Sequence, residues 1–226
     1  MSRPLEVRRL GRVGYDEALA LQRALVEERR ADRIPDQLLV LEHPPVITLG
    51  VKGDGGRSHI TAPPAVLDAL GIRVFEAGRG GDVTYHGPGQ LVAYPIIDLR
   101  PDRCDVHRYV RDLEEVMIRL CAAHDVTAGR VTGLTGVWVG QVKIGAIGVR
   151  VSRWITSHGL AFNVAPDLDH FALIIPCGIG DRGVTSLARA TGHPVDFEAV
   201  QAQLIGFFAD VFERQLLQSS RVGSDS

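Results

Sequence analysis

Residues 137 to 151 read Val137-Trp138-Val139-Gly140-Gln141-Val142-Lys143-Ile144-Gly145-Ala146-Ile147-Gly148-Val149-Arg150-Val151, and this stretch decides the fold. Its residues alternate with a period of two, which is typical of β-strands. The alternation breaks at Gly140-Gln141, where the glycine suits a tight turn. The stretch therefore predicts a β-hairpin.

Outward from this hairpin, the sequence predicts more strands than helices. We expect strands at 38–41, 46–49, 72–75, 91–97 and 155–164. We expect helices at 15–31, 64–70, after an N-cap at Asp105, from 184–188 onward, and at 197–217 after an N-cap at Asp196. Hairpins beside single helical crossings favour an α/β fold of the α+β type, in which a mixed β-sheet is flanked by helices.

The composition is that of a soluble globular protein of 226 residues with 45% hydrophobic residues. A net charge of −2 without a basic run argues against a nucleic-acid partner. Three cysteines without metal or redox spacing favour a reducing compartment, and the absence of a signal-like or 18-residue apolar stretch predicts a cytoplasmic protein without membrane association. No repeat or linker divides the chain, so we expect one domain over 1–218 and a disordered tail at 219–226.

Cys177 lies in the stretch Ile174-Ile175-Pro176-Cys177-Gly178-Ile179-Gly180-Asp181. The apolar run before Pro176 is typical of a strand, and the thiol follows it between glycines, ahead of the expected helix. A thiol in such a loop is accessible to a substrate, and main-chain N–H groups around it favour the thiolate. The alternative is a small buried hydrophobic residue, the role we expect for Cys121. Position alone does not separate the two interpretations of Cys177.

Lys143 is conspicuous because Lys52 is the only other lysine among 25 basic residues. In the expected strand it shares a face with Gly145 and Ile147. A buried lysine is able to release its proton, which an arginine does not do, so Lys143 is a candidate to stabilise a thiolate and to carry a proton. The alternative is an edge-strand lysine that discourages aggregation.

A glycine-rich loop at 78–90 brings the main chain close to a ligand without matching a Rossmann or P-loop motif. It contains Arg79, whose guanidinium suits a carbonyl or phosphate group, and His86. His158 lies before a run of small residues. We expect the other histidines to be solvated, namely His43, His59, His107, His124, His170 and His193. No histidine pair has metal-ligand spacing, so no metal site is predicted.

Three blocks together resemble the octanoyl-[acyl-carrier-protein]:protein N-octanoyltransferases of lipoate assembly. The blocks are Arg79 to Gln90, then Lys143 to Gly148 with Ser157 to Val164, then Pro176-Cys177-Gly178. The resemblance extends from about residue 8 to 215, with Phe162 standing where the family more often has leucine. It implies a mixed sheet flanked by helices, similar to the catalytic domain of biotin and lipoate protein ligases.

The resemblance also implies the site and its partners. It implies a Cys177/Lys143 dyad, no cofactor and no metal. The donor would be octanoyl-acyl carrier protein, and the acceptors lipoyl domains of 2-oxoacid dehydrogenase complexes and the glycine cleavage H protein, served by a monomer. The implied acyl-substrate contacts are Arg79, Gly80, Gly81, Asp82, Val83, Thr84, Tyr85, His86, Ala146, Ile147, Gly148, Gly159, Leu160 and Ala161.

These residues lead to the hypothesis of a two-step acyl transfer through a thioester on Cys177, with main-chain N–H groups near Gly178 as oxyanion donors. His86 is assigned to positioning. Three rival interpretations are an ATP-dependent lipoate or biotin protein ligase, a non-catalytic scaffold for acylated carrier proteins, and a cysteine amidase with His158 as base. The group that serves as base in each half-reaction stays open.

Overall fold

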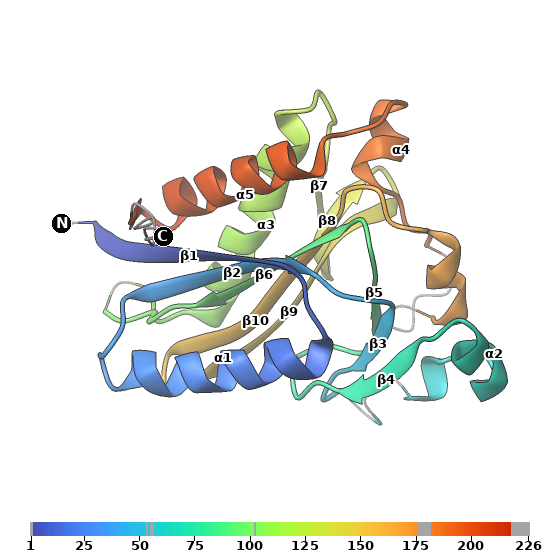
Figure 1. Cartoon of the computed structure of the whole chain (residues 1–226). Coiled ribbons are helices and arrows are strands. Elements are labelled where there is room, and N and C mark those ends of the chain that lie inside the picture. Colours follow the sequence, from blue (N-terminus) through green and yellow to red (C-terminus); the bar gives the residue numbers. More distant parts are fainter. Residues whose placement is uncertain (1, 53, 55–56, 102, 176–181, 218–226) are drawn as a thin grey trace, which may run out of the picture.

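The computed structural model describes residues 2–52, 54, 57–101, 103–175 and 182–217. Cys177 and the tail 219–226 therefore lie outside the described residues. Within them, the main sheet has eight strands in the order β11-β1-β2-β6-β10-β9-β8-β7 (Figure 1). Their bounds are β1 Arg3–Arg12, β2 Asp36–Glu42, β6 Gln90–Ile96, β7 Gly129–Val131, β8 Leu134–Val139, β9 Val142–Ser152, β10 Ile155–Asn163 and β11 Arg214–Leu216.

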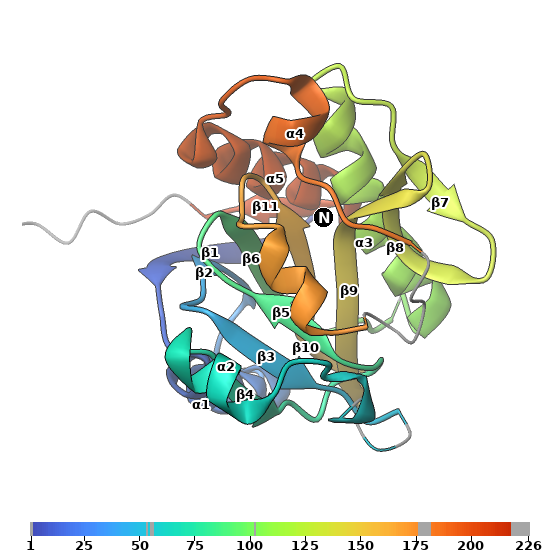
Figure 2. The same cartoon turned by 90° about the vertical axis from the view of Figure 1, so that its right-hand side faces the viewer.

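The main sheet is mixed, as the sequence predicted. Strand β1 pairs in parallel with both β2 and β11, and every other neighbouring pair is antiparallel. A smaller sheet has the order β4-β3-β5, with β3 at Val46–Leu49, β4 at Arg73–Glu76 and β5 at Thr84–His86. Figure 2 shows β3 and β5 lying across the main sheet beside β9 and β10.

Helices cover both faces of the main sheet (Figure 1). Helices α3, Val106–Ala122, and α5, Phe197–Val211, lie on one face, and α1, Tyr15–Arg30, lies on the other. The shorter elements are α2 Pro64–Ala69, α4 Leu187–Thr191, and the 3-10 helices η1 Arg57–His59 and η2 Asp169–Leu173. No helix among these elements is long and apolar enough to cross a bilayer.

Strand β2 shows how the sequence period produces the two cores. Leu38 and Val40 contribute to the core under α3 and α5, whereas Leu39 and Leu41 contribute to the core under α1. All four side chains are fully buried. Successive residues of a strand point to opposite faces, so an unbroken apolar run is what a strand covered on both sides requires.

The hairpin expected at 137–151 is confirmed. Strand β8 ends at Val139, β9 begins at Val142, and Gly140 adopts a φ of +58° in the turn between them. Trp138 lies opposite Lys143, and a register shift separates this pair from the next one. The turn position that glycine permits therefore sets where Lys143 lies on the sheet.

The helix expected at 197–217 was too long. Helix α5 ends at Val211, and the chain reverses at Glu213, whose φ is +53°. Residues Arg214–Leu216 then form β11 against β1. The N-caps expected at Asp105 and Asp196 are confirmed, because each carboxylate accepts hydrogen bonds from main-chain N–H groups of its helix.

Other differences concern short or edge elements. We did not expect strand β1, β5 or β7 from the sequence. The strand expected before Pro176 is replaced by η2 and a single bridge between Ile60 and Ile174, because two apolar residues are too few to extend a ladder. Helix α4 begins at Leu187 after a Ser186 N-cap, close to the expected position.

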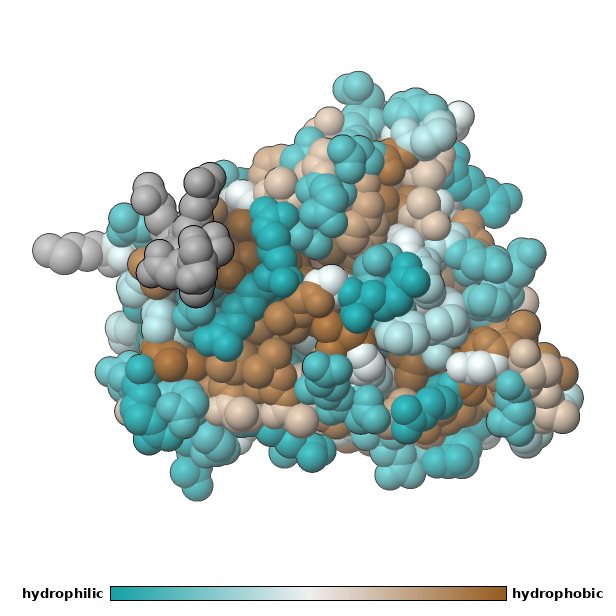
Figure 3. Space-filling view, in the orientation of Figure 1, coloured by the Kyte–Doolittle hydropathy of each residue, from teal (hydrophilic) through white to brown (hydrophobic). Residues whose placement is uncertain are grey.

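Strand β1 lies near the edge of the sheet, and polar side chains cover much of it. Arg9 donates a hydrogen bond to Gln201 of α5 at 2.7 Å, and Arg8 donates to Gln37 of β2 at 2.9 Å. Figure 3 shows an apolar band on this face of the molecule, crossed by hydrophilic side chains. Long arginine side chains shield apolar surface while their charged ends stay in water.

Candidate active site

A cavity of about 550 Å³ lies between the main sheet and the smaller sheet. Its walls come from the loop before β5, from β6, and from the paired strands β9 and β10. All implied substrate-contact residues except Tyr85 line it, and so does Lys143. Whether these residues contact a substrate stays a prediction. His158, the base of the rival amidase interpretation, lines it as well. Residues without an assigned role also line it: Tyr15, Lys52, Gln90, Tyr94, Val110, Gly133, Leu134, Thr135, Gly145, Val149, Asn163, Phe171 and Val184.

The loop containing Arg79 is fixed to β9 by its main chain. Gly80 N donates to Val149 O at 2.9 Å, and Val51 N donates to Arg79 O at 3.0 Å. The buried guanidinium of Arg79 donates from Nη2 to both Thr48 O and Thr48 Oγ1 at 2.9 Å. The loop is therefore held rigidly, with a cation at the cavity wall.

Gly148 is required for the close approach of this loop to β9. A Cβ atom at Gly148 would lie 2.8 Å from Arg79 Cδ and 3.1 Å from Gly80 O. Such distances are too short for ordinary contacts, so a side chain at this position would displace the arginine. The glycine pattern of β9 thus has a steric cause in the structure.

Lys143, the second residue of β9, is half-buried at the cavity wall. Its Nζ atom lies 4.7 Å from the centre of the Trp138 ring, in the geometry of a cation–π contact. Its stem passes Gly136, where a Cβ atom would lie 3.4 Å from Lys143 Cε. The indole and the small residue together direct the ammonium group along the hairpin.

The main chain of Lys143 also binds the segment that follows Cys177 in the sequence. Lys143 N donates to Gly183 O at 3.0 Å, and Thr185 N donates to Lys143 O at 2.9 Å. Cys177 itself lies outside the described residues, so its distance from Lys143 is not tested. Gly183 follows Cys177 by six positions in the chain.

His86 is buried beside the cavity and is neutral. Its Nδ1 atom lies 2.6 Å from Gln90 Oε1, and its Nε2 atom lies 3.5 Å from Thr48 Oγ1. Burial lowers the pKa of His86 to about 3, with His43 and Arg79 adding to the effect and Gln90 opposing it. An imidazole with this pKa carries no charge at neutral pH.

His43 was expected to be solvated, and this was wrong. Its side chain is fully buried, and the rings of His43 and His86 lie 5.7 Å apart. His43 Nδ1 donates to Val13 O at 2.8 Å, which leaves Nε2 to accept from the hydroxyl of Tyr94 at 2.8 Å. The two prolines that follow His43 suggested an exposed turn, but this ring packs beneath the turn, and burial lowers its pKa.

His158 lies within β10 in a left-handed backbone conformation, with φ of +55°. Its N–H donates to Gln22 Oε1 at 2.7 Å, and its ring is buried against Tyr94. Burial lowers the pKa of His158 to about 4, helped by Arg79 and opposed by a hydrogen bond with the main chain of Ala77. A strained, neutral histidine is therefore part of the cavity wall.

Two implied contact residues bind other parts of the protein. The hydroxyl of Tyr85 lies 2.7 Å from His170 Nδ1, and its ring packs on Phe171, outside the cavity lining. Asp82 accepts from Val83 N at 2.7 Å and lies 2.8 Å from His59 Nδ1. Both residues stabilise the loop that carries Arg79 toward the cavity.

Cys121 is fully buried on α3, as expected, and burial raises its pKa to about 12. Cys104 is exposed. Among the cysteines that the structure describes, neither lines the cavity. Cys177 stays the candidate nucleophile on the sequence argument alone.

Tyr15, Gln90 and Asn163 were the main omissions of the sequence analysis. Gln90 and Asn163 stand inside the quoted blocks but received no role. Tyr15 begins α1, and its buried hydroxyl has no hydrogen-bond partner among the described residues. Only the pairing of β6 with β10, which places Gln90 opposite Asn163, would have connected two of these residues.

The chain belongs to the lipoyl protein ligase A/B catalytic domain family, whose family model matches residues 14–209. Its relatives include the octanoyltransferase of Chloroflexus aggregans, 52% identical over 93% of this chain and 96% of the relative. The octanoyltransferase of Desulforamulus reducens is 47% identical over 92% of this chain and 91% of the relative.

Solved structures confirm the expected fold. Lipoate-protein ligase A bound with ATP superposes with a TM-score of 0.74 at 15% identity, over 97% of this chain and 90% of that one. Biotin protein ligase from Aquifex aeolicus superposes with a TM-score of 0.51 at 14% identity, over 94% of this chain and 70% of that one. At these identities the comparison concerns the fold alone.

Proposed function

We propose that this protein transfers an octanoyl group from octanoyl-acyl carrier protein to a lysine amine of a lipoyl domain, through a thioester on Cys177. The observation that carries the proposal is the shared cavity wall. Lys143, the Arg79 loop and the small residues of β9 and β10 line one cavity. The octanoyltransferase names of relatives at 47% and 52% identity support the acyl group.

The shape of the cavity suits an acyl chain. Gly148 and Gly159 lie opposite each other on β9 and β10, and Ala146 lies opposite Ala161. Ala146, Ala161 and Leu160 line the cavity, whereas Arg79 and Gly80 pack over Gly148, and Ala93 and Pro95 pack over Gly159. An alkyl chain placed in the cavity leaves water, and each buried methylene contributes about 0.8 kcal/mol to binding.

In the first half-reaction, the Cys177 thiolate attacks the thioester carbonyl of the donor. A carbon–sulfur bond to Cys177 forms, the bond to the phosphopantetheine sulfur breaks, and the Lys143 ammonium gives that sulfur a proton. In the second, the acceptor amine attacks the acyl-enzyme, and an amide bond forms. The neutral Lys143 takes the proton from nitrogen, and Cys177 leaves as thiolate, which restores the starting state.

The buried histidines fit this division of roles. His158 and His86, with pKa values of about 4 and about 3, are weak bases at neutral pH. A weak base accepts a proton poorly from an attacking amine, which counts against an amidase that uses His158 as its base. Lys143 is accordingly assigned both proton transfers.

Intact-mass measurement after mixing with octanoyl-acyl carrier protein tests the proposal. We expect one octanoyl adduct on the protein, formed without ATP, removed by addition of a lipoyl domain, and absent from Cys177→Ser. Absence of an adduct on the unmodified protein would favour a non-catalytic scaffold. Undiminished, ATP-dependent acylation of the lipoyl domain by Cys177→Ser would favour a ligase.

The acceptor proteins, the cellular location and the oligomeric state belong to the same proposal. The acceptors would be lipoyl domains of 2-oxoacid dehydrogenase complexes and the glycine cleavage H protein, and the enzyme would act as a cytoplasmic monomer. A direct comparison of isolated acceptor domains, at equal concentration and with one donor preparation, ranks these substrates. An enzyme that octanoylates none of them would contradict the assignment.

A further inference from the structure

Asn163, the last residue of β10, carries a buried amide that neither proposed half-reaction uses. Asn163 is 5% exposed and lines the cavity. Asn163 Nδ2 donates to Thr185 O at 2.9 Å, and Asn163 Oδ1 accepts from Gln90 Nε2 at 3.0 Å. The amide therefore joins the sheet to the segment that follows Cys177 in the chain.

The direction of these hydrogen bonds is fixed by two main-chain carbonyls. Thr185 O only accepts, so Asn163 must present its NH₂ group there and its oxygen to Gln90. Gln90 Nε2 also donates to Tyr85 O, at 3.3 Å, so Gln90 Oε1 must face His86. His86 then donates from Nδ1, and its Nε2 atom is the acceptor, 3.5 Å from the Thr48 hydroxyl.

The segment 183–188 is held on both sides at this end of the sheet. Lys143 binds Gly183 and Thr185 through main-chain hydrogen bonds, and Ala188 N donates to Val164 O at 2.9 Å. Asn163 adds the side-chain hydrogen bond to Thr185 O between these two attachments. Its position therefore controls how the segment meets Lys143.

We propose that Asn163 is a positioning residue for acyl transfer: through Thr185 it holds the segment that follows Cys177 in register with Lys143. The inference rests on the proposed function, since it takes Cys177 and Lys143 as the pair that must meet. A hydrogen bond that sets the distance between two reacting groups affects the rate strongly, because a displacement of about 1 Å costs about 100-fold.

Asn163→Asp and Asn163→Ala test the proposal in a Cys104→Ser background, which removes the exposed thiol. Both variants lose the donor to Thr185 O, and we expect acyl-enzyme formation to slow by about 100-fold with little change in the KM for the donor. A large KM increase with an unchanged maximal rate would instead assign Asn163 to substrate binding and overturn the proposal.

The pH profile separates positioning from a general loss of structure. As pH falls, the aspartate of Asn163→Asp becomes protonated, and its O–H group is able to donate to Thr185 O again. The ratio of the Asn163→Asp rate to the Asn163→Ala rate should therefore rise toward low pH. A ratio that stays constant with pH would contradict the role assigned to the donor.

Alkylation of Cys177 by iodoacetamide provides a readout that needs no acyl donor. If acyl-enzyme never forms on the unmodified protein, the proposed function fails, while slower alkylation in both Asn163 variants still supports positioning. Unchanged alkylation and unchanged acylation overturn the positioning role alone. Gln201→Ala is the matched control, because Gln201 is equally buried, accepts from Arg9 at 2.7 Å and lies on α5 away from the cavity.

Discussion

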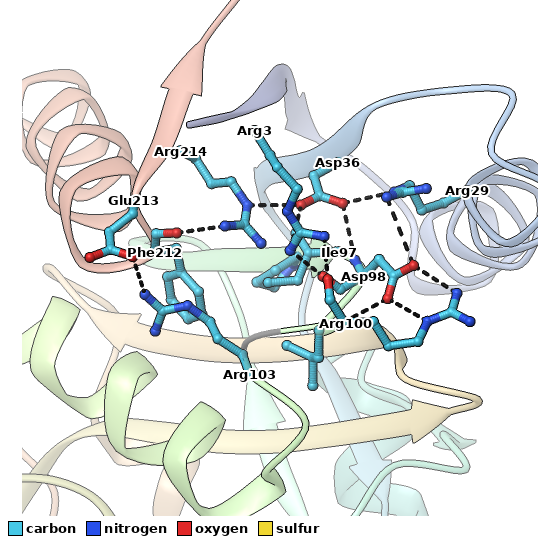
Figure 4. Close-up of polar contacts among 12 residues, drawn as sticks. Arg3, Arg29, Asp36, Ile97, Asp98, Arg100, Arg103, Phe212, Glu213 and Arg214 are labelled. Carbon is cyan, nitrogen blue, oxygen red and sulfur yellow. Dashed lines mark hydrogen bonds and ion pairs between the residues drawn. The ribbon is translucent and has the colours of Figure 1, made fainter. Parts of the chain in front are cut away.

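Two of the buried polar regions that the structure describes satisfy their polar groups in opposite ways. Around Asp36, at the start of β2, oppositely charged side chains pair directly (Figure 4). Arg29 and Arg214 each place Nε 2.8 Å from a different Asp36 oxygen. Around the cavity, His43, His86 and His158 are buried with lowered pKa values, and so are neutral. In the first region charged groups pair with one another, and in the second the three histidines are uncharged.

This difference separates the residues that hold the fold from those that perform chemistry. A carboxylate between two guanidinium groups is a fixed arrangement, and removing one partner leaves the others buried without compensation. Besides the neutral imidazoles, the cavity wall has the basic side chains of Lys52, Arg79 and Lys143. Variants of the first region should change stability, and variants of the second should change activity.

Lys143→Met should give the largest effect. Removal of the group assigned to both proton transfers should lower the transfer rate by up to about 10⁴-fold, while the apolar stem still packs beside Gly136. Single-turnover transfer to a lipoyl domain measures the rate, and urea denaturation checks that stability is retained. A variant with full activity would remove Lys143 from the mechanism.

Asp36→Ala should change stability instead. Arg29 and Arg214 would stay buried without their carboxylate, so we expect a loss of about 3–5 kcal/mol in the free energy of unfolding. Activity per folded molecule at low temperature should persist. Arg33→Ala, which breaks an exposed pair with Glu28, is the control and should leave the urea midpoint unchanged. Equal effects of both variants would contradict the assignment of the Asp36 region.

Gly148→Ala should affect both properties moderately. The added Cβ atom would lie 2.8 Å from Arg79 Cδ, so the arginine or the strand must shift, at a cost of about 1–3 kcal/mol. Because the shift occurs at the cavity wall, we expect a higher KM for the acyl donor. Urea midpoints and steady-state kinetics measure the two effects, and an unchanged KM would place the acyl chain elsewhere.

The two regions should lose stability over different pH ranges. In the unfolded chain a histidine titrates near pH 6.5, whereas folded His86 and His158 have pKa values of about 3 and about 4. Between these values the unfolded state binds more protons, so stability falls as pH drops from about 6.5 to 4, by up to about 1.4 kcal/mol per pH unit for each histidine.

Asp98, beside the Asp36 region, should affect stability at lower pH than the histidines do. Burial alone would raise its pKa, but hydrogen bonds from Arg100 outweigh burial and lower it. A lowered carboxyl pKa contributes stability at neutral pH that is lost only as pH falls below about 4. Urea midpoints measured from pH 8 to 3 should thus first decline between about pH 6.5 and 4, because of the histidines around the cavity. A flat curve down to pH 4 would contradict the neutral state of the histidines.

The sequence predicted the mixed sheet because its strands and helices are periodic over long stretches. The hairpin at 137–151, the strand predicted at 155–164 and observed at Ile155–Asn163, and the caps at Asp105 and Asp196 follow from local rules. Strand β11 did not, because three residues show no period and form only by pairing with β1, far away in the chain. The prediction from helix propensity therefore continued α5 beyond Val211.

For the cavity, short motifs were informative and isolated residues were not. The glycines around Arg79 predicted a close approach of the main chain to a ligand, which stays a prediction; the structure shows this loop packed against Gly148 of β9. Burial of His43 depends on a tertiary contact with Tyr94 that no local pattern encodes. Asn163 likewise gains its role from Thr185 and Gln90, which only the folded sheet brings together.

The pairing of Arg214 with Asp36 has a consequence for synthesis of the chain. The two residues are 178 positions apart, and β11 completes the edge of the sheet beside β1. While a ribosome is still translating the intervening segment, Asp36 has met Arg29 but lacks its C-terminal partner. The nascent protein thus cannot close this end of the sheet until Arg214 has emerged, which favours a late, cooperative step of folding at this edge over stepwise completion from the N-terminus.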